Sequence, residues 1–134
     1  MPGPDQPLDP ASLDPEDAKI LTLARVARQR AYAPHTGVVE GAAVRDTDGR
    51  TYAAGTVENA DPRLTTSAVR AALAAAVSSG ARAFEAVALV TEHSLMCSDD
   101  VAVIAEFGAT PVLIAGPDGT LATTVHVGSE TEAE

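Results

Sequence analysis

The feature that most constrains this chain is the stretch from residue 55 to residue 80. It begins Gly-Thr-Val-Glu-Asn-Ala-Asp-Pro-Arg-Leu-Thr-Thr-Ser and continues into an alanine-rich run. This order predicts a strand end, a turn at Asp61 and Pro62, and a helix whose N-terminus is marked by the hydroxyl residues 65–67. Such a loop is a frequent place for a binding site, because backbone N–H groups and the positive end of the helix dipole point into it.

Length and charge limit what the chain is expected to bind. A chain of 134 residues suits one domain with a real core. Its net charge of −10 comes from 19 acidic and 9 basic residues, without the basic patch that a nucleic-acid partner requires. Cys97 is the single cysteine, so no internal disulfide is possible. No apolar run approaches the roughly 18 residues of a membrane span, so we expect no membrane partner and a cytoplasmic location.

Composition also predicts the ends of the domain. Residues 1–15 are acidic and rich in proline, so they are expected to form a flexible arm. Residues 128–134 are an acidic tail that is expected to be disordered in the same way. The folded domain is therefore predicted to span residues 16–127.

Hydrophobic periodicity within that span predicts helices and strands in alternation. The helix around Val69, Leu73, Ala76 and Val77 has these four residues on one apolar stripe. Helices are expected at residues 15–31, 66–79 and 98–107, and strands at 38–44, 51–57, 87–90, 111–115 and 120–127. This order favours an α/β fold, a three-layer α/β/α sandwich with a mixed five-stranded sheet.

Four motifs occur in an order and spacing that resemble a known family. They are Tyr-Ala-Pro-His-Thr-Gly-Val-Val-Glu-Gly-Ala-Ala at 32–43, Thr-Val-Glu-Asn-Ala at 56–60, Leu-Thr-Thr-Ser-Ala-Val-Arg at 64–70 and Met-Cys-Ser-Asp-Asp-Val at 96–101. They resemble Tyr-Ala-Pro-Tyr-Ser-x-Phe-x-Val-Gly-Ala-Ala, Asn-Val-Glu-Asn-Ala, Leu-Thr-x-Cys-Ala-Glu-Arg and Pro-Cys-Gly-x-Cys-Arg of the small zinc-dependent cytidine deaminases. The resemblance covers about residues 18 to 124 and implies the same fold.

The residues that would perform the chemistry differ from that pattern. A zinc deaminase uses three thiolate or imidazole ligands, and a separate glutamate moves protons between water and base. Carried over by position, the three ligands fall on Ser67, Cys97 and Asp100, and the catalytic glutamate falls on Val69. Only Cys97 is a suitable soft ligand, and a valine cannot transfer a proton. We therefore expect no catalytic residue, no metal ligand set and no zinc cofactor.

The nucleoside-binding positions implied by the resemblance are also altered. The family's Asn-x-Glu pair, which grips the ribose, corresponds to Thr56 and Glu58, so one of its two polar groups remains. The phenylalanine that packs on the base corresponds to Val38. Loss of an aromatic platform removes about 1 kcal/mol or more of base stacking. Substrate contacts, if any remain, are therefore expected from Glu58, Thr56 and Val38.

Each of these residues also has an ordinary structural interpretation. Glu58 would accept backbone N–H bonds near a helix start, and Cys97 would be a small buried hydrophobe. Asp99 and Asp100 would favour a helix N-terminus through the dipole alone. His93 lies four residues before Cys97 and is the histidine nearest in sequence to the family's metal position.

Two functions remain open from the sequence. The first is a catalytically inactive cytidine deaminase-like protein that acts through oligomerisation or through weak binding of a nucleoside or protein partner. The alternative is a divergent nucleoside deaminase, a hydrolase with an altered metal site. The resemblance implies a homo-oligomer, either a tetramer or a dimer, because the family is homotetrameric.

Overall fold

The computed structural model describes residues 13–93 and 95–128, so the predicted arm and tail lie almost wholly outside the described residues. The helices are α1 (Pro15–Gln29), α2 (Ala68–Ser78) and α3 (Ser98–Ala105), with a short 3₁₀ turn at Pro62–Leu64. The strands are β1 (Gly41–Asp46), β2 (Thr51–Gly55), β3 (Phe84–Val90), β4 (Thr110–Ala115) and β5 (Leu121–Val127). The predicted alternation of helices and strands is confirmed. Within the described residues, no helix is long and apolar enough to span a bilayer.

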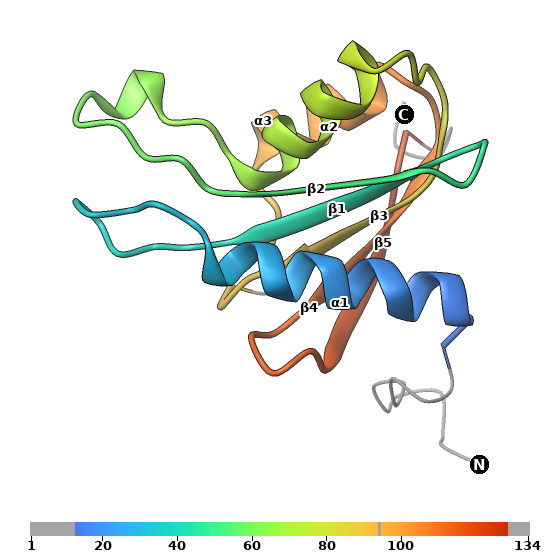
Figure 1. Ribbon diagram of the computed structural model, residues 1–134, viewed down its shortest axis with the longest axis horizontal. Helices are drawn as coiled ribbons and strands as arrows, with labels where there is room; N and C mark the ends of the chain where they lie inside the picture. Colours follow the sequence, from blue (N-terminus) through green and yellow to red (C-terminus); the bar gives the residue numbers. More distant parts are fainter. Residues whose placement is uncertain (1–12, 94, 129–134) are drawn as a thin grey trace.

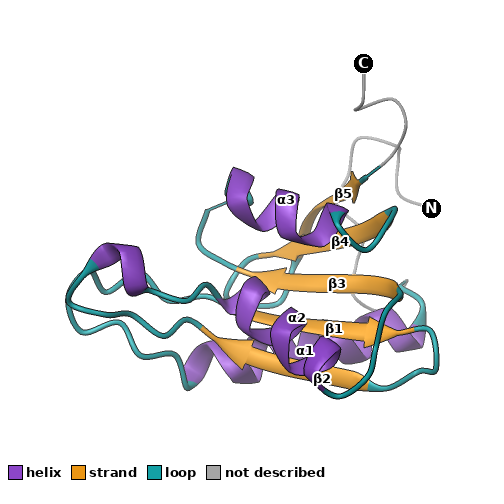
Figure 2. Cartoon of the chain, turned by 90° about the horizontal axis from the view of Figure 1, so that it is seen from above, coloured by secondary structure: helices purple, strands orange, loops and turns teal. Residues whose placement is uncertain are grey.

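The five strands form one mixed sheet in the order β2-β1-β3-β4-β5. Strands β3 and β4 are parallel, and every other neighbouring pair is antiparallel. Figure 2 shows the sheet from above, with β1 and β3 in its interior. Strand β3 is buried on both faces, as its continuous apolar run predicts.

Helix α1 covers one face of the sheet (Figure 1). Its N-terminus is capped by Asp14, whose side chain accepts a hydrogen bond from the Glu16 N–H at 2.8 Å. The helix lies very close to β1, because a Cβ placed on Gly41 would come within 2.0 Å of the Ala24 carbonyl oxygen. Glycine at that position therefore sets the distance between this helix and the sheet.

Helices α2 and α3 cover the opposite face, which completes the three predicted layers. The predicted apolar stripe of α2 is confirmed: Val69, Leu73 and Ala76 are buried against the sheet, and Val77 is partly buried beside them. This face holds the larger of the two core clusters, which includes residues of β1, β3, β4 and β5.

Several predicted ends differ from the structure: β1 spans Gly41–Asp46 rather than residues 38–44, and β3 begins at Phe84 rather than at residue 87. Two further differences have one shared reason. Strand β2 ends at Gly55 rather than at residue 57, and α2 begins at Ala68 rather than at residue 66. Between them, Val57 and Thr66 exchange backbone hydrogen bonds of 3.0 and 2.9 Å. This pairing closes the loop of residues 57–66 on itself. It leaves Ser67 free to cap the helix.

Candidate functional site

A cavity of about 410 Å³ opens at the edge of the sheet where β1 begins and β2 ends. The loop after α1, the segment after β2 and the first turn of α2 line it. Gly41 pairs with Gly55 on one side and with Val90 on the other, so the end of β3 reaches the same edge. The cavity therefore lies beside the N-terminus of α2, at the end of the sheet where β1 begins and β2 ends.

Ser67 and Asp100, two of the positions expected to replace metal ligands, bind each other. The Ser67 hydroxyl donates to Asp100 Oδ1 at 2.7 Å. Its oxygen accepts from the backbone N–H of Arg70 at 3.0 Å, which caps α2, and from Arg70 Nε at 3.1 Å. Arg70 Nε also lies 3.4 Å from Asp100 Oδ1. A serine, an arginine and an aspartate thus form a closed network that joins the starts of α2 and α3.

Val69, at the family's catalytic glutamate position, is fully buried and belongs to the core of the α2 face. Its side chain packs beside Leu73 and the sheet. A carboxylate there would need polar partners that this apolar cluster does not supply. The described structure therefore places a hydrophobic contact where the family pattern has its proton-transferring group.

The interpretation of Cys97 as a small buried hydrophobe is wrong, because Cys97 is exposed. It is the N-cap residue of α3 and makes no side-chain capping bond. Asp99 and Asp100 do lie in the first turn of α3, but the Asp100 carboxylate turns to Ser67 and Arg70. The helix dipole alone therefore does not explain why Asp100 is at this position, because its carboxylate also binds two side chains of another helix.

The side chains at the ligand positions do not fit a zinc ion. The lone pairs of Ser67 and the nearer oxygen of Asp100 accept hydrogen bonds or face the guanidinium of Arg70. These oxygens therefore already face a cation of the protein itself, which leaves them poorly suited to bind a metal cation. Across residues 13–93 and 95–128, no group of three or more His, Cys, Asp or Glu side chains is arranged to hold a metal ion.

Glu58 lies at the cavity wall and is 8% exposed. Its carboxylate accepts the backbone N–H of His35 at 2.6 Å, the backbone N–H of Thr36 at 3.1 Å and the Thr36 hydroxyl at 2.5 Å. The Thr36 hydroxyl and the two backbone N–H groups hold the pKa of the Glu58 carboxyl below its usual range, against the opposing effect of desolvation. Glu58 therefore fixes the loop after α1, which forms one wall of the cavity.

Thr56 and Val38, the other two positions predicted to contact substrate, also line the cavity. Thr56 is buried, and its hydroxyl oxygen accepts the backbone N–H of Glu40 at 3.0 Å and lies 3.3 Å from the Glu40 carbonyl oxygen. The side chain of Val38 is 47% exposed. The structure thus brings the three predicted residues to one cavity, with two of them already bonded to neighbouring backbone.

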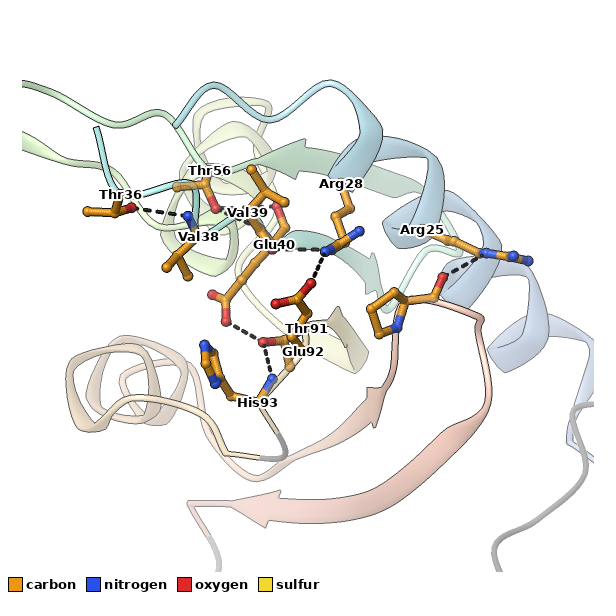
Figure 3. A network of polar contacts seen from close by, with 11 residues as sticks. Arg25, Arg28, Thr36, Val38, Val39, Glu40, Thr56, Thr91, Glu92 and His93 are labelled. Atoms are coloured by element: carbon orange, nitrogen blue, oxygen red, sulfur yellow. Dashed lines mark hydrogen bonds and ion pairs between the residues drawn. The ribbon is translucent and has the colours of Figure 1, made fainter. Parts of the chain in front are cut away.

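Glu40 is a cavity residue that the sequence reasoning missed. Its Oε2 accepts the hydroxyl of the buried Thr91 at 2.6 Å, and Figure 3 shows this bond beside the backbone contact with Thr56. The signal was present in the sequence, because Glu40 stands where the family pattern has a valine before Gly-Ala-Ala. Arg70 was noted only as a match, although it supplies the cation of the network described above.

His93 is exposed, and its backbone N–H donates to the hydroxyl oxygen of Thr91 at 3.1 Å. Figure 3 places it on the Glu40 side of the site, next to Thr91. Its nearness in sequence to Cys97 is not matched by a side-chain hydrogen bond or ion pair with Ser67, Cys97 or Asp100 among the described residues.

Comparisons with known proteins agree with this fold and motif order. A cytidine deaminase-like family profile matches residues 13–119. A cytidine deaminase from Sporosarcina psychrophila is 36% identical over 108 residues, which cover 77% of this chain and 79% of that protein. The crystal structure of cytidine deaminase from Burkholderia pseudomallei has a TM-score of 0.76 at 29% identity, covering 82% of this chain and 91% of that one. Cytidine deaminase from Mycobacterium tuberculosis has a TM-score of 0.68 at 27% identity, covering 86% and 93%.

Proposed function

The chain belongs to the cytidine deaminase-like family, and we propose that within this family it is a catalytically inactive protein. Its action would be to bind a small ligand weakly in the cavity, or to assemble with copies of itself or a protein partner. The observation that carries the proposal is the network of Ser67, Arg70 and Asp100 at the family's metal position.

Two missing groups, the proton-transferring glutamate and the metal ligands of the family, support the proposed absence of catalysis. General acid–base help contributes about 10²–10⁴ in rate, and activation of water by a metal adds several kcal/mol. Val69 removes the first contribution, because it is a buried hydrocarbon side chain. The donor set of Ser67 and Asp100, already bonded to each other and to Arg70, argues against the second.

A retained cavity supports the binding role. Its volume of about 410 Å³ lies within the range of small-molecule sites. Its relatives are named as cytidine deaminases, so a nucleoside is the first ligand to test. Affinity should be low, because Glu58 already accepts bonds from His35 and Thr36. Glu58→Gln should weaken nucleoside binding, whereas Cys97→Ser should leave it unchanged.

The deciding experiment measures zinc content and cytidine turnover in the purified full chain. We expect no stoichiometric zinc and no loss of the cytidine absorbance band. Ser67→Cys with Asp100→Cys would supply three thiolates together with Cys97, and this double variant should bind zinc without turnover. Addition of Val69→Glu should then be required for deamination, because a proton-transferring group is still missing. Near-stoichiometric zinc or turnover in the unmodified protein would instead establish a divergent deaminase.

Self-assembly has a surface available on the α2–α3 face. An apolar groove there is lined by Leu73, Ala74, Val77, Val103 and Phe107. We expect a dimer or tetramer in light scattering at micromolar concentration. Ala74→Glu, in the groove, should dissociate it, and Ala75→Glu, exposed on the same helix, is the matched control. A monomer in the unmodified protein would remove this part of the proposal.

A further inference from the structure

Glu40 immediately precedes β1 and is held in place by hydrogen bonds of its own backbone. Its N–H donates to Thr56 Oγ1 at 3.0 Å, and its carbonyl oxygen accepts the Thr56 N–H at 3.1 Å. The residue that follows it, Gly41, is fixed against α1 by the close approach of the two backbones. The direction in which the Glu40 side chain leaves the backbone is therefore set by the fold.

The carboxylate of Glu40 is also fixed, through one of its two oxygens. Oε2 accepts the Thr91 hydroxyl at 2.6 Å, and that hydroxyl oxygen in turn accepts the His93 N–H at 3.1 Å (Figure 3). The Oε1 atom accepts no hydrogen bond from the described part of the chain, 13–93 and 95–128. Glu40 is half-buried and lines the cavity, so this second oxygen is available to a ligand there.

The other charged groups of the cavity are already committed to protein partners. The Glu58 carboxylate accepts hydrogen bonds from His35 and Thr36. Arg70 is paired with Asp100, so its charge is balanced from within the protein. Glu40 has no ionic partner among the described residues. The lining therefore carries an excess of negative charge that its own cation does not neutralise.

We propose that the cavity binds a small molecule carrying a cationic nitrogen, an ammonium or amidinium group, and that Glu40 is its recognition residue. This rests on the proposed binding role of the cavity and adds the chemical class of the ligand. A charge-assisted hydrogen bond from such a nitrogen to the free oxygen would be stronger than one from a neutral donor. Neutral cytidine and uridine are accordingly weaker ligands than a cation of similar size.

Benzamidine, benzamide and benzoate test the inference, since they share a shape and differ in charge. Calorimetry and amide NMR shifts on the full chain should show benzamidine binding about tenfold more tightly than benzamide, with shifts at residues 40 and 91, and benzoate binding least. Glu40→Gln should remove this preference, because glutamine keeps the bond to Thr91 and loses the charge. Glu106→Gln, which removes an exposed carboxylate outside the cavity, should preserve it.

Three results would overturn the inference. These are equal binding of benzamidine and benzamide, a preference that survives Glu40→Gln, and the lack of saturable benzamidine binding at millimolar concentration. The second would show attraction by the overall charge of −10 rather than recognition by one residue. Zinc content and cytidine turnover, measured on the same preparation, report separately on the proposed inactivity.

Discussion

Asp100 and Glu58 are two nearly buried carboxylates at the same end of the molecule, and they are stabilised in different ways. Asp100 is 2% exposed and directs one oxygen to a hydroxyl and a guanidinium from another helix. Glu58 is 8% exposed and directs its oxygens to two backbone N–H groups and a hydroxyl of one loop. The first carboxylate is balanced by a charge, and the second by neutral donors.

The difference decides what each carboxylate holds in place. Asp100 joins the starts of α2 and α3, elements that begin 30 residues apart in the sequence (68 and 98). Glu58 orders residues 35 and 36, which carry no regular secondary structure of their own. The Asp100 network therefore connects two helices on one face of the sheet, whereas Glu58 keeps the shape of the cavity.

The largest effect is expected from Asp100→Ala. The change removes the charged acceptor of the Ser67 hydroxyl, and hydrogen bonds to charged groups contribute about 1.5–3 kcal/mol. Arg70 is partly exposed, so solvent can compensate for its lost contact, and we expect a cost of about 2 kcal/mol. Urea unfolding would measure the loss. Asp99→Ala is the matched control, because Asp99 is exposed in the same helical turn, and its effect should stay within about 0.5 kcal/mol. Equal losses in both variants would mean that the network contributes nothing.

Ser67→Ala should have a smaller effect of about 1 kcal/mol, the usual cost of losing a helix N-cap. Arg70 would keep its contact with Asp100, so the ion pair would survive the change. Thermal unfolding of this variant is compared with that of Ser78→Ala, which replaces an exposed serine at the other end of α2. A loss as large as that of Asp100→Ala would show that the hydroxyl, not the cation, stabilises the aspartate.

Glu58→Gln should reduce stability in a manner that depends on pH. The pKa of Glu58 is lowered in the folded state, chiefly by the Thr36 hydroxyl. Its contribution is therefore fully present above the unfolded-state pKa of about 4.3 and is lost as the pH falls through the lower folded value. The unmodified protein should exceed Glu58→Gln in stability at pH 7 by more than at pH 3. Denaturant unfolding at both values checks this, and a pH-independent difference would contradict it.

The fold was predictable because it depends on local patterns. The apolar stripe of α2, the doubly buried run of β3 and the turn chemistry before α2 each indicated the correct element and order. The boundaries near residues 57 and 66 were wrong, because their pairing depends on a contact between two loop segments. Local sequence carries little information about such a bridge.

The site was only partly predictable. Glu58, Thr56 and Val38 were placed at one cavity by resemblance, and they do line it. The bond between Ser67 and Asp100 joins residues 33 positions apart, and only the packing of α2 beside α3 reveals it. The exposure of Cys97 was missed, because a residue type indicates average burial and not the position of one helix cap.

The smallest effect is expected from Thr36→Val, which tests how neutral donors stabilise Glu58. This change removes the hydroxyl that lies 2.5 Å from Glu58 and leaves the backbone N–H groups of residues 35 and 36 in place. Because that hydroxyl is the largest cause of the lowered pKa, the pKa of Glu58 should rise toward its ordinary value while the protein stays folded.

An NMR titration of the Glu58 side-chain carboxyl carbon measures this rise directly. Thr124→Val is the matched control, since Thr124 is exposed on β5, and it should leave the titration of Glu58 unchanged. The free-energy costs of Asp100→Ala and of Ser67→Ala should also be the same with and without Thr36→Val. The reason is that the Glu58 bonds and the Asp100 network share no residue. A Glu58 pKa that does not move in Thr36→Val would mean that the backbone N–H groups alone hold the charge. In that case Glu58 would be stabilised by backbone N–H groups alone, whereas Asp100 is stabilised by a side-chain cation.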